Sequence, residues 1–313
     1  MKEPHIFGVL LFLDKMKKNL PNFIIIGAMK AATTSIYTYL KQHPDIFMPK
    51  VKEPMFFNNY HQDNKYVVKG SKEKKITTLK QYKSLFDEVK AESAIGEASP
   101  TYIYNEKAAE LIKKEIPNVK IIVVLRQPVE RAYSNFLHAK RSGKESENDF
   151  EKTFDLENER KIANWSPLYH YKSKGFYFEQ LQRYFKVFPK ENIKILLFED
   201  IVKSPMESTQ KLFSFLEVDA NFKPDTSKKT NVSGKPKGIL GWVLMKIRYY
   251  NLLPNIQLSK YLPQSAIRLL FKAVYEKPEK LDKQLKKKLT EKHFKSDILQ
   301  LEKLIEKDLS HWL

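Results

Sequence analysis

The fold of this chain is most constrained by a run of four apolar residues followed by a glycine. Phe23–Ile26 is rich in β-branched side chains, and Gly27 follows directly. So short and wholly apolar a run predicts a strand that is buried on both faces of a parallel sheet. Small and hydroxyl residues follow from Ala28 to Ser35, and apolar residues at helical spacing continue to Leu40. We therefore predict a strand, a tight turn and a helix in that order.

The turn before this helix is a candidate anion site. The first N–H groups of a helix have no partner within the helix, and the positive end of its dipole faces the same way. Lys30 places a cation in the turn. The common nucleoside-triphosphate pattern GxxxxGK[ST] is absent, because two alanines separate Lys30 from the hydroxyl residues. On these residues alone, an ordinary parallel-sheet crossover remains an alternative.

The rest of the chain alternates short apolar runs with amphipathic segments, which predicts an α/β fold. Further strands are predicted at 45–48, 94–100, 120–126 and 193–198. Helices are predicted near 79–86, 102–116, 128–142, 177–188, 206–218 and 239–275, with two more within 278–313. The chain has 313 residues, no internal repeat and no break in composition, so we predict a single domain.

Two connecting segments are predicted to be irregular. Residues 144–170 are polar and then aromatic, and we expect a variable loop beside the site. Residues 221–238 are basic and contain Gly and Pro, and they either cover a cofactor or serve as a linker.

An arginine and a serine follow the apolar run at 120–125. Arg126 ends the predicted strand, and the carboxyl ends of central parallel strands are where open α/β sheets bind ligands. Pro128 opens the next helix at its favoured first-turn position. Ser134 lies off the apolar stripe of that helix. A guanidinium fork and one hydroxyl can bind a single phosphate, although a plain surface serine is the alternative for Ser134.

A glutamate stands between lysines and aromatic residues in the segment KVKEPMFF. Pro54 disfavours a helical conformation at Glu53, so we expect a loop or a strand edge there. A carboxylate in this setting can line a pocket with an apolar floor, and a solvated loop glutamate is the alternative.

The composition excludes some chemistry and favours anionic partners. The net charge is +19, although the lysines are spread over the whole chain. There are no cysteines, which excludes thiolate catalysis, disulfides and zinc–thiolate sites and agrees with a reducing compartment. The seven histidines show no metal-ligand spacing, so no metal is expected. We expect a cytoplasmic protein.

The apolar segment Ile6–Leu13 is too short to span a bilayer. It has no basic lead-in and no small-residue cleavage site, so we expect a short packing helix rather than a signal peptide. No other run approaches membrane length, and no transmembrane segment is expected.

Six segments occur in an informative order: GAMKAATTS, KEPMFF, LRQPVERAYSNF, GFYFEQLQRYF, LLFED and DLSHW. Together they resemble the sulfotransferases that use 3′-phosphoadenosine 5′-phosphosulfate (PAPS), especially the branch of heparan sulfate sulfotransferases and their bacterial relatives. The resemblance covers about residues 20–313. It implies a P-loop-type three-layer α/β fold, with a central parallel sheet flanked by helices. Residues 1–20 are then an N-terminal extension, and 21–313 are the sulfotransferase domain.

The resemblance implies roles for individual residues. Lys30 matches the family's loop lysine, and Glu53 matches the general base of the glycan-sulfating branch. Arg126 and Ser134 match the pair that binds the 3′-phosphate of PAPS. The residues that match the 5′-phosphosulfate loop are Ala31, Ala32, Thr33, Thr34 and Ser35. The acceptor implied is a hydroxyl or amine, with an anionic glycan or another carbohydrate as the leading class.

The chain departs from the family pattern at several of these places. The family loop usually has two glycines where Ala31 and Ala32 stand, and alanine disfavours a turn with positive φ. Gln127 replaces the asparagine common after the strand-end arginine, and Met55 replaces a histidine common in the glycan enzymes. The late lysine-glycine-arginine loop of the family has no clear counterpart here.

Two other functions remain open at this point. A P-loop phosphoryl-transfer kinase shares the fold, but it needs a lysine next to Ser or Thr and an acidic magnesium ligand. A basic nucleic-acid-binding protein, the alternative from another class, needs aromatic residues interleaved with a basic stripe. The aromatic residues here fall on predicted core faces, so we expect no nucleic-acid partner.

Overall fold

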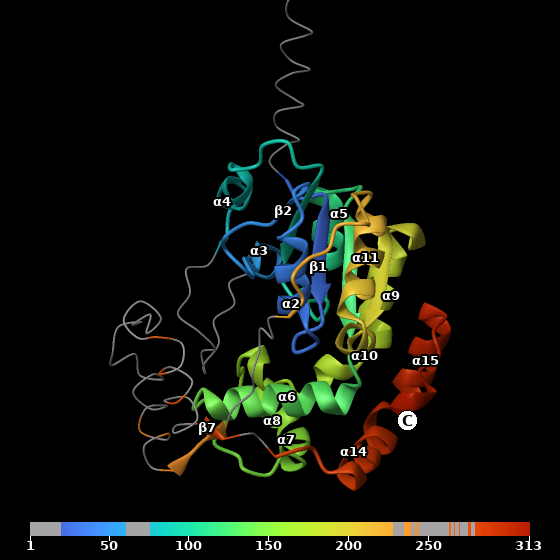
Figure 1. Cartoon of the computed structure of the whole chain (residues 1–313). Coiled ribbons are helices and arrows are strands. Elements are labelled where there is room, and N and C mark those ends of the chain that lie inside the picture. The colour runs from blue at the N-terminus through green and yellow to red at the C-terminus, as the bar shows by residue number, and fades with distance from the viewer. Residues whose placement is uncertain are drawn as a thin grey trace, which may run out of the picture.

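The computed structural model describes residues 20–60, 76–227 and 279–313, together with short pieces between 235 and 276. Its centre is a five-stranded sheet in the order β2-β3-β1-β4-β5 (Figure 1). The strands are β1 (Phe23–Gly27), β2 (Ile46–Phe47), β3 (Ala94–Ala98), β4 (Lys120–Leu125) and β5 (Ile193–Leu197). Every neighbouring pair is parallel, so all five carboxyl ends lie along one edge of the sheet.

The central strand β1 is buried along its whole length, as its apolar sequence predicts. It pairs with β3 on one side and with β4 on the other, with Ile25 opposite both Ala98 and Ile122. Gly27 closes the strand where space is short, since a Cβ there would lie 2.5 Å from Cγ2 of Ile103. The chain can therefore turn closely over the end of the sheet at this point.

Two pairs of helices make the outer layers. Helix α2 (Thr33–Leu40) packs with α11 (Pro205–Leu216), and α5 (Ala108–Glu115) packs with α9 (Tyr177–Val187). From β1 the chain crosses toward the β2 edge, and from β3 it crosses toward the β5 edge. Right-handed crossovers in these opposite directions place α2 and α5 on opposite faces of the sheet. The predicted three-layer α/β fold is confirmed.

Helix α6 (Pro128–Arg141) follows β4 and runs across the end of the sheet rather than along a face (Figure 1). Two C-terminal helices close this side, because α14 (Lys283–Leu289) contacts α6 and α15 (Lys295–Ile305) contacts α9. The other helices within the described residues are α3 (Phe56–Asn59), α4 (Leu79–Lys83), α7 (Lys152–Asp155), α8 (Glu157–Ile162) and α10 (Phe198–Lys203). Two short strands, β6 (Lys235–Pro236) and β7 (Tyr275–Glu276), form an antiparallel pair. Short helical turns lie at Ser84–Phe86, Pro167–Tyr169, Ser173–Gly175, Lys190–Asn192, Thr290–Phe294 and Ser310–Trp312.

Two predictions about these elements are wrong. The helix predicted at 102–116 begins at Ala108, because the Asn105 side chain accepts a hydrogen bond from the N–H of Lys107 at 2.9 Å and holds a turn. Residues 144–170 are not a variable loop. They contain α7 and α8 and a buried ion pair between Glu145 and Arg160.

Some predictions fall outside the described residues. The N-terminal extension, with its apolar segment Ile6–Leu13, is one of them, and most of the helical segment expected at 239–275 is another. The division into an extension and one domain stays a prediction.

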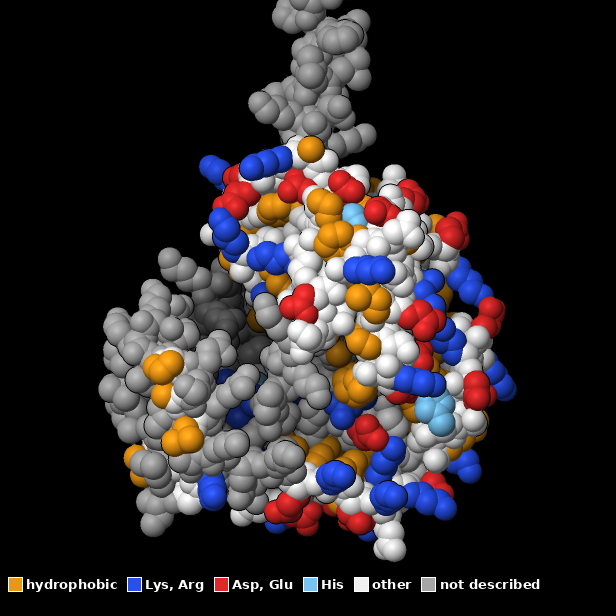
Figure 2. All heavy atoms as spheres, viewed as in Figure 1, with side chains coloured by type: hydrophobic (Ala, Val, Ile, Leu, Met, Phe, Trp, Pro, Cys, Tyr) orange, Lys and Arg blue, Asp and Glu red, His pale blue; other side chains and the backbone are white. Residues whose placement is uncertain are grey.

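The face of the molecule in Figure 2 carries side chains of both charges. Lys and Arg are interspersed there with Asp and Glu, rather than gathered in one stripe. This distribution gives no support to the nucleic-acid-binding alternative, which needs a continuous basic surface.

Candidate active site

The loop between β1 and α2 has a strained backbone. Lys30 has φ 71° and Ala32 has φ 64°, both in the left-handed region. We expected Ala31 and Ala32 to exclude a positive-φ turn, and at Ala32 this prediction is wrong. Ala32 is the residue before the first turn of α2, and left-handed backbone there lets the N–H groups of Thr33 and Thr34 face the loop, while the N–H of Ser35 donates to the oxygen of Ala32 at 2.9 Å. Alanine adopts this conformation at a cost of about 1–2 kcal/mol.

Arg126 reaches this loop from the end of β4. Its Nη1 donates a hydrogen bond to the main-chain oxygen of Lys30 at 3.2 Å. Its guanidinium lies 4.3 Å from the ring centroid of Phe198, and Nη2 lies 3.6 Å from a carboxylate oxygen of Glu130. The two predicted donor-binding segments, 96 residues apart in the sequence, therefore meet at the carboxyl edge of the sheet.

The residues near Arg126 fit a bound phosphate. The Nε atom of Arg126 is buried and has no hydrogen-bond partner among the described residues. A buried, unpaired donor on a guanidinium is costly unless an acceptor binds there. Ser134 lies on α6, one to two turns into the helix, and its side chain is half-buried. No hydrogen bond joins Ser134 to Arg126 among the described contacts, so the role of Ser134 in phosphate binding stays a prediction.

Glu53 is held close to the same loop. Its N–H donates to the oxygen of Ala98 at 3.1 Å, so KEPMFF is attached to the end of β3. Its φ is 58°, so Glu53 is outside the right-handed helical region but not in the extended conformation that a following proline favours. The Glu53 carboxylate pairs with Lys52 at 2.5 Å and is about one third exposed, with a side-chain exposure of 37%. It therefore faces the solvent side of the site.

A second glutamate supports this loop from beneath. Glu97, in β3, is fully buried, and its carboxyl group accepts hydrogen bonds from the hydroxyls of Tyr82 at 3.2 Å and Ser99 at 2.9 Å. The Ser99 Oγ in turn accepts from the N–H of Met55 at 3.0 Å. Burial raises the pKa of Glu97 to about 7. The sequence analysis missed this residue, although a charged residue in a five-residue buried strand was a signal.

The charges around Lys30 are mostly positive. Burial and the nearby guanidinium groups of Arg141 and Arg126 lower the pKa of Lys30 to about 8, and the Glu53 carboxylate acts in the opposite direction. Lys30, Arg126 and Glu53, predicted from three separate segments, are thus close enough to affect one another's charge. A site with this excess of cations suits a ligand with several negative charges.

His43 and His138 are the two other side chains that we consider as the base if Glu53 does not serve. His138, on α6, has a pKa lowered to about 4 by burial and by Lys30 and Arg141, so it is neutral near pH 7 and a weak base. His43 lies elsewhere, because its Nε2 bonds to the oxygen of Asp219 at 3.0 Å and its ring packs against Phe213. His43 is a core residue, and the idea that it serves as the base is wrong.

Lys174 is a cation beside the loop after β1, and the sequence analysis missed it. Its side chain is buried beneath the loop after β1, and Nζ contacts Sδ of Met29 at 3.6 Å. Burial and the positive charge of Arg131 lower the pKa of Lys174 to about 7. No local pattern marks this lysine, because its place in the site depends on the packing of 173–180 against β1 and α6.

Among the described residues, no three His, Asp or Glu side chains come together in a way that would hold a metal ion. Across the same residues, no helix has the length and apolar character needed to cross a membrane. The absence of a metal stays a prediction.

The sequence and the fold both match known proteins. The family model described as "Sulfotransferase domain" matches residues 20–233. The crystal structure of a sulfotransferase from Alicyclobacillus acidocaldarius superimposes with a TM-score of 0.73 and 30% identity, covering 94% of this chain and 98% of that one.

Curated relatives match over shorter lengths. The membrane-associated sulfotransferase kil1 of Dictyostelium discoideum is 38% identical over 118 residues, which is 37% of this chain and 22% of that protein. Heparan sulfate glucosamine 3-O-sulfotransferase 3A1 of Mus musculus is 26% identical over 238 residues, 72% of this chain and 56% of that protein. The chain thus spans about half or less of the length of these curated relatives.

Proposed function

The chain belongs to the family of PAPS-dependent sulfotransferases, and we propose that it transfers a sulfuryl group from PAPS to a hydroxyl or amine of a carbohydrate acceptor. The observation that carries this proposal is the contact between Arg126 and the Lys30 main chain at the carboxyl edge of the sheet. This contact brings the start of helix α2, which can bind one anionic group, next to the Arg126 guanidinium, which can bind another. A ligand with phosphate groups at two positions requires two such neighbouring sites.

Two groups of residues bind the two charged ends of the donor PAPS. Lys30 and the loop from Ala31 to Ser35, with the N–H groups of Thr33 and Thr34, hold the 5′-phosphosulfate, because a helix start and a cation face that position. Arg126 and Ser134 hold the 3′-phosphate, with the unpaired Nε of Arg126 as one of the donors. PAPS supplies the activated sulfuryl group, and these residues orient it.

Lys30 stabilises charge as the reaction proceeds. Negative charge builds on the leaving phosphate when the bond to sulfur breaks, and a preorganised cation in a partly buried site stabilises that charge strongly. Burial and the nearby arginines lower the pKa of Lys30, while a phosphate next to it raises the pKa again and keeps the ammonium charged.

Glu53 removes the acceptor's proton. An acceptor hydroxyl must lose a proton as it attacks sulfur, and a carboxylate within hydrogen-bond reach can take it. Glu53 is the partly exposed carboxylate whose charge acts on Lys30, so an acceptor that approaches from solvent meets Glu53 beside the donor. His138 is a weaker candidate for this role because its pKa is lowered to about 4.

The proposal also specifies the class of acceptor, which is a carbohydrate. It is supported by relatives that include heparan sulfate glucosamine 3-O-sulfotransferases and a carbohydrate sulfotransferase. The test is a screen of glycans, lipids and small alcohols with radiolabelled PAPS as donor. Labelled product with a glycan supports the proposal. Magnesium-dependent hydrolysis of ATP without any sulfate transfer would favour a kinase instead.

A cytoplasmic location is proposed separately. It is supported by the absence of cysteine from all 313 residues, which agrees with a reducing compartment. Fractionation of cells that express the chain, with activity measured in each fraction, tests it.

A further inference from the structure

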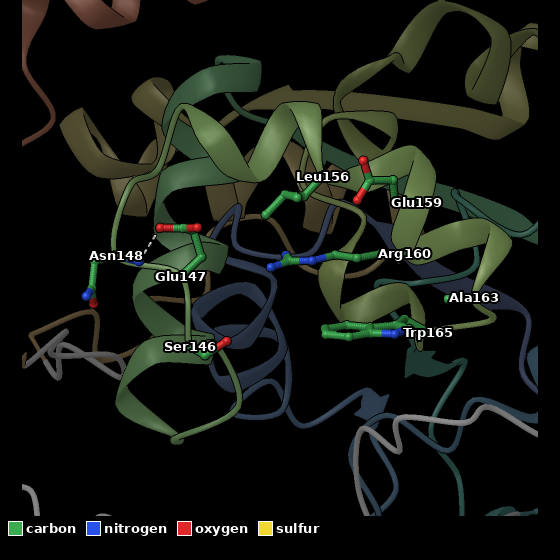
Figure 3. A pocket seen from close by; sticks show the side chains of 8 residues that line it. All are labelled: Ser146, Glu147, Asn148, Leu156, Glu159, Arg160, Ala163 and Trp165. Atoms are coloured by element: carbon green, nitrogen blue, oxygen red, sulfur yellow. Dashed lines mark hydrogen bonds between the residues drawn. The ribbon is translucent and has the colours of Figure 1, made fainter.

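A groove of about 470 Å³ lies between the segment after α6 and the helix α8 (Figure 3). Ser146, Glu147 and Asn148 line one side, and Glu159, Arg160 and Trp165 line the other. Its volume falls in the range of about 300–1,000 Å³ that small-molecule sites occupy. None of the residues assigned above to the donor or to proton transfer lines it.

The floor of the groove is rigid. Arg160 donates from both terminal nitrogens to the Glu145 carboxylate, at 2.8 and 2.9 Å, and the Tyr171 hydroxyl donates to the same carboxylate at 2.8 Å. The side chains of Arg160 and Glu145 are only 7% and 1% exposed. A buried, bidentate pair with an additional hydrogen bond fixes the positions of both side chains. The groove is therefore formed before any ligand arrives.

Trp165 provides an aromatic surface on this floor. The Arg160 guanidinium lies 5.1 Å from one indole ring centroid, and Tyr169 meets the indole edge-on at 4.9 Å. These contacts hold a half-buried indole whose remaining surface lines the groove, and Figure 3 shows it below Arg160, on the same side of the groove as Glu159. The face of an indole is negative, so it attracts the weakly positive C–H groups on a sugar ring.

The polar groups of the wall have both signs of charge. Arg160 is already paired with Glu145, and Glu147 lies 3.3 Å from the ammonium of Lys152, so neither charge needs a charged ligand. Glu159 repels an anion and its carboxylate accepts hydrogen bonds, while the side chains of Ser146 and Asn148 both donate and accept them. A hydroxyl group can satisfy either kind of partner, because it donates and accepts. The wall thus suits an uncharged ligand that carries several hydroxyls.

The groove is also near the donor loop. Arg141, the last residue of α6, is close enough to Lys30 to lower its pKa. Ser146 follows Arg141 by five residues, and a chain of that length spans at most about 18 Å. The connecting segment is held between α6 and the groove, because the N–H of Lys144 donates to the oxygen of Ala139 at 2.9 Å and the Tyr169 hydroxyl donates to the oxygen of Lys144 at 3.0 Å. A short oligosaccharide can therefore reach from the groove to the reacting centre.

We propose that this groove binds an uncharged, hydroxyl-rich pyranose unit of the acceptor, with the ring packed on Trp165. The role of the groove in binding the acceptor rests on the proposed sulfuryl transfer. The binding of a sugar in the groove does not require turnover and can be measured without it. It narrows the acceptor class, since the unit in the groove carries no sulfate or carboxylate even if the rest of the acceptor is anionic.

Saturation-transfer NMR with a panel of uncharged di- and trisaccharides of glucose, galactose, mannose and N-acetylhexosamines tests the proposal. At least one should bind the unmodified full chain, and its affinity should fall tenfold or more in Trp165→Ala. Trp165→Phe should retain most of the binding, because a smaller aromatic face remains. Ile162→Ala is the matched control, because this side chain is 88% exposed at the end of α8, three residues before Trp165, and does not line the groove.

Binding of 3′-phosphoadenosine 5′-phosphate (PAP) to each variant reports on the fold and on the donor site. Unchanged PAP binding in Trp165→Ala shows that a lost sugar signal is local. The proposal is overturned if no uncharged saccharide binds, or if Trp165→Ala leaves the affinity unchanged. It is also overturned if a sulfated heparin oligosaccharide or tetramethylammonium competes for the groove as well as the uncharged sugar does. Sugar binding without any PAP binding would instead contradict the proposed function and leave the groove assignment standing.

Discussion

The Arg126 guanidinium donates a hydrogen bond to the main-chain oxygen of Lys30 at 3.2 Å, across 96 residues of sequence. This contact fixes the distance between the loop after β1 and the end of β4. The same arginine packs on Phe198, which follows β5, so residues from the ends of three neighbouring strands meet at the site. Its geometry therefore depends on the parallel sheet and not on any single motif.

Replacing Lys30 should affect the rate more than the binding of the donor. Lys30→Ala should lower kcat by about 100-fold or more, comparable with the loss of one oxyanion donor, because the leaving oxygen gains charge during transfer. The KM for PAPS should change much less. Steady-state kinetics with labelled PAPS measures both. A variant with normal kcat and only a raised KM would assign Lys30 to simple binding.

Replacing Glu53 should separate catalysis from donor binding. Glu53→Gln keeps the shape of the side chain and removes the base, so turnover should fall by about 10²–10⁴-fold while PAP binds normally. The acidic limb of the pH–rate profile should disappear as well. Glu88→Gln is a control, since Glu88 is an exposed carboxylate that pairs with the exposed Lys50 and has no role assigned in the reaction. Near-normal transfer by Glu53→Gln would move the role of base to another group, with His138 the next to test.

Relieving the strained loop should stabilise the protein. Ala32→Gly should raise the free energy of unfolding by about 1 kcal/mol, because glycine adopts φ 64° without the steric penalty that alanine has. Ala31→Gly is the matched control. Ala31 is buried and has no positive φ, so this change should instead destabilise the protein by about 0.5–1 kcal/mol. Denaturant unfolding measures both, and equal effects of the two variants would contradict the assignment.

The buried Glu97 should make stability depend on pH. Its pKa is raised to about 7 in the folded chain, so between its ordinary value and pH 7 the folded state binds the proton that the unfolded state has released. Stability should therefore fall as the pH rises through this window, by at most about 1.4 kcal/mol per pH unit for this one group. Glu97→Gln should reduce that slope and keep the hydrogen bonds to Tyr82 and Ser99.

Part of the slope should remain in Glu97→Gln. Burial also raises the pKa of Asp297 to about 7, and this carboxyl group accepts from the N–H groups of Tyr177 and Phe178. Thermal unfolding at a series of pH values measures the effect. An unchanged slope in the Glu97 variant would show that Glu97 is ionised in the folded protein.

Local sequence patterns predicted the elements of the fold well, but not the contacts between them. The apolar runs at 23–26 and 121–125 indicated buried strands because strands covered on both faces are mostly apolar, and Pro128 marked the start of α6. Lys30 and Arg126 could be selected because each follows such a strand. The positive φ of Ala32 could not be foreseen, because it is imposed by the close turn over β1.

Other features of the site depend on tertiary packing alone. Lys174 and Arg160 are isolated cations in the sequence, and only the folded chain places one beneath Met29 and the other on Glu145. The segment 144–170 has no strong periodicity, and its short helices are held by the buried pair Glu145–Arg160 rather than by an apolar stripe of their own.

The central claim is that this chain holds a nucleotide with a 3′-phosphate between the Lys30 loop and Arg126. Isothermal titration with PAP and with adenosine 5′-phosphate, which lacks the 3′-phosphate, tests it directly. The unmodified protein should bind PAP more tightly, and Arg126→Ala should weaken PAP binding by about 1.5–3 kcal/mol, the range for hydrogen bonds to charged groups, with little change for adenosine 5′-phosphate. Equal affinity of the unmodified protein for the two nucleotides would contradict the account.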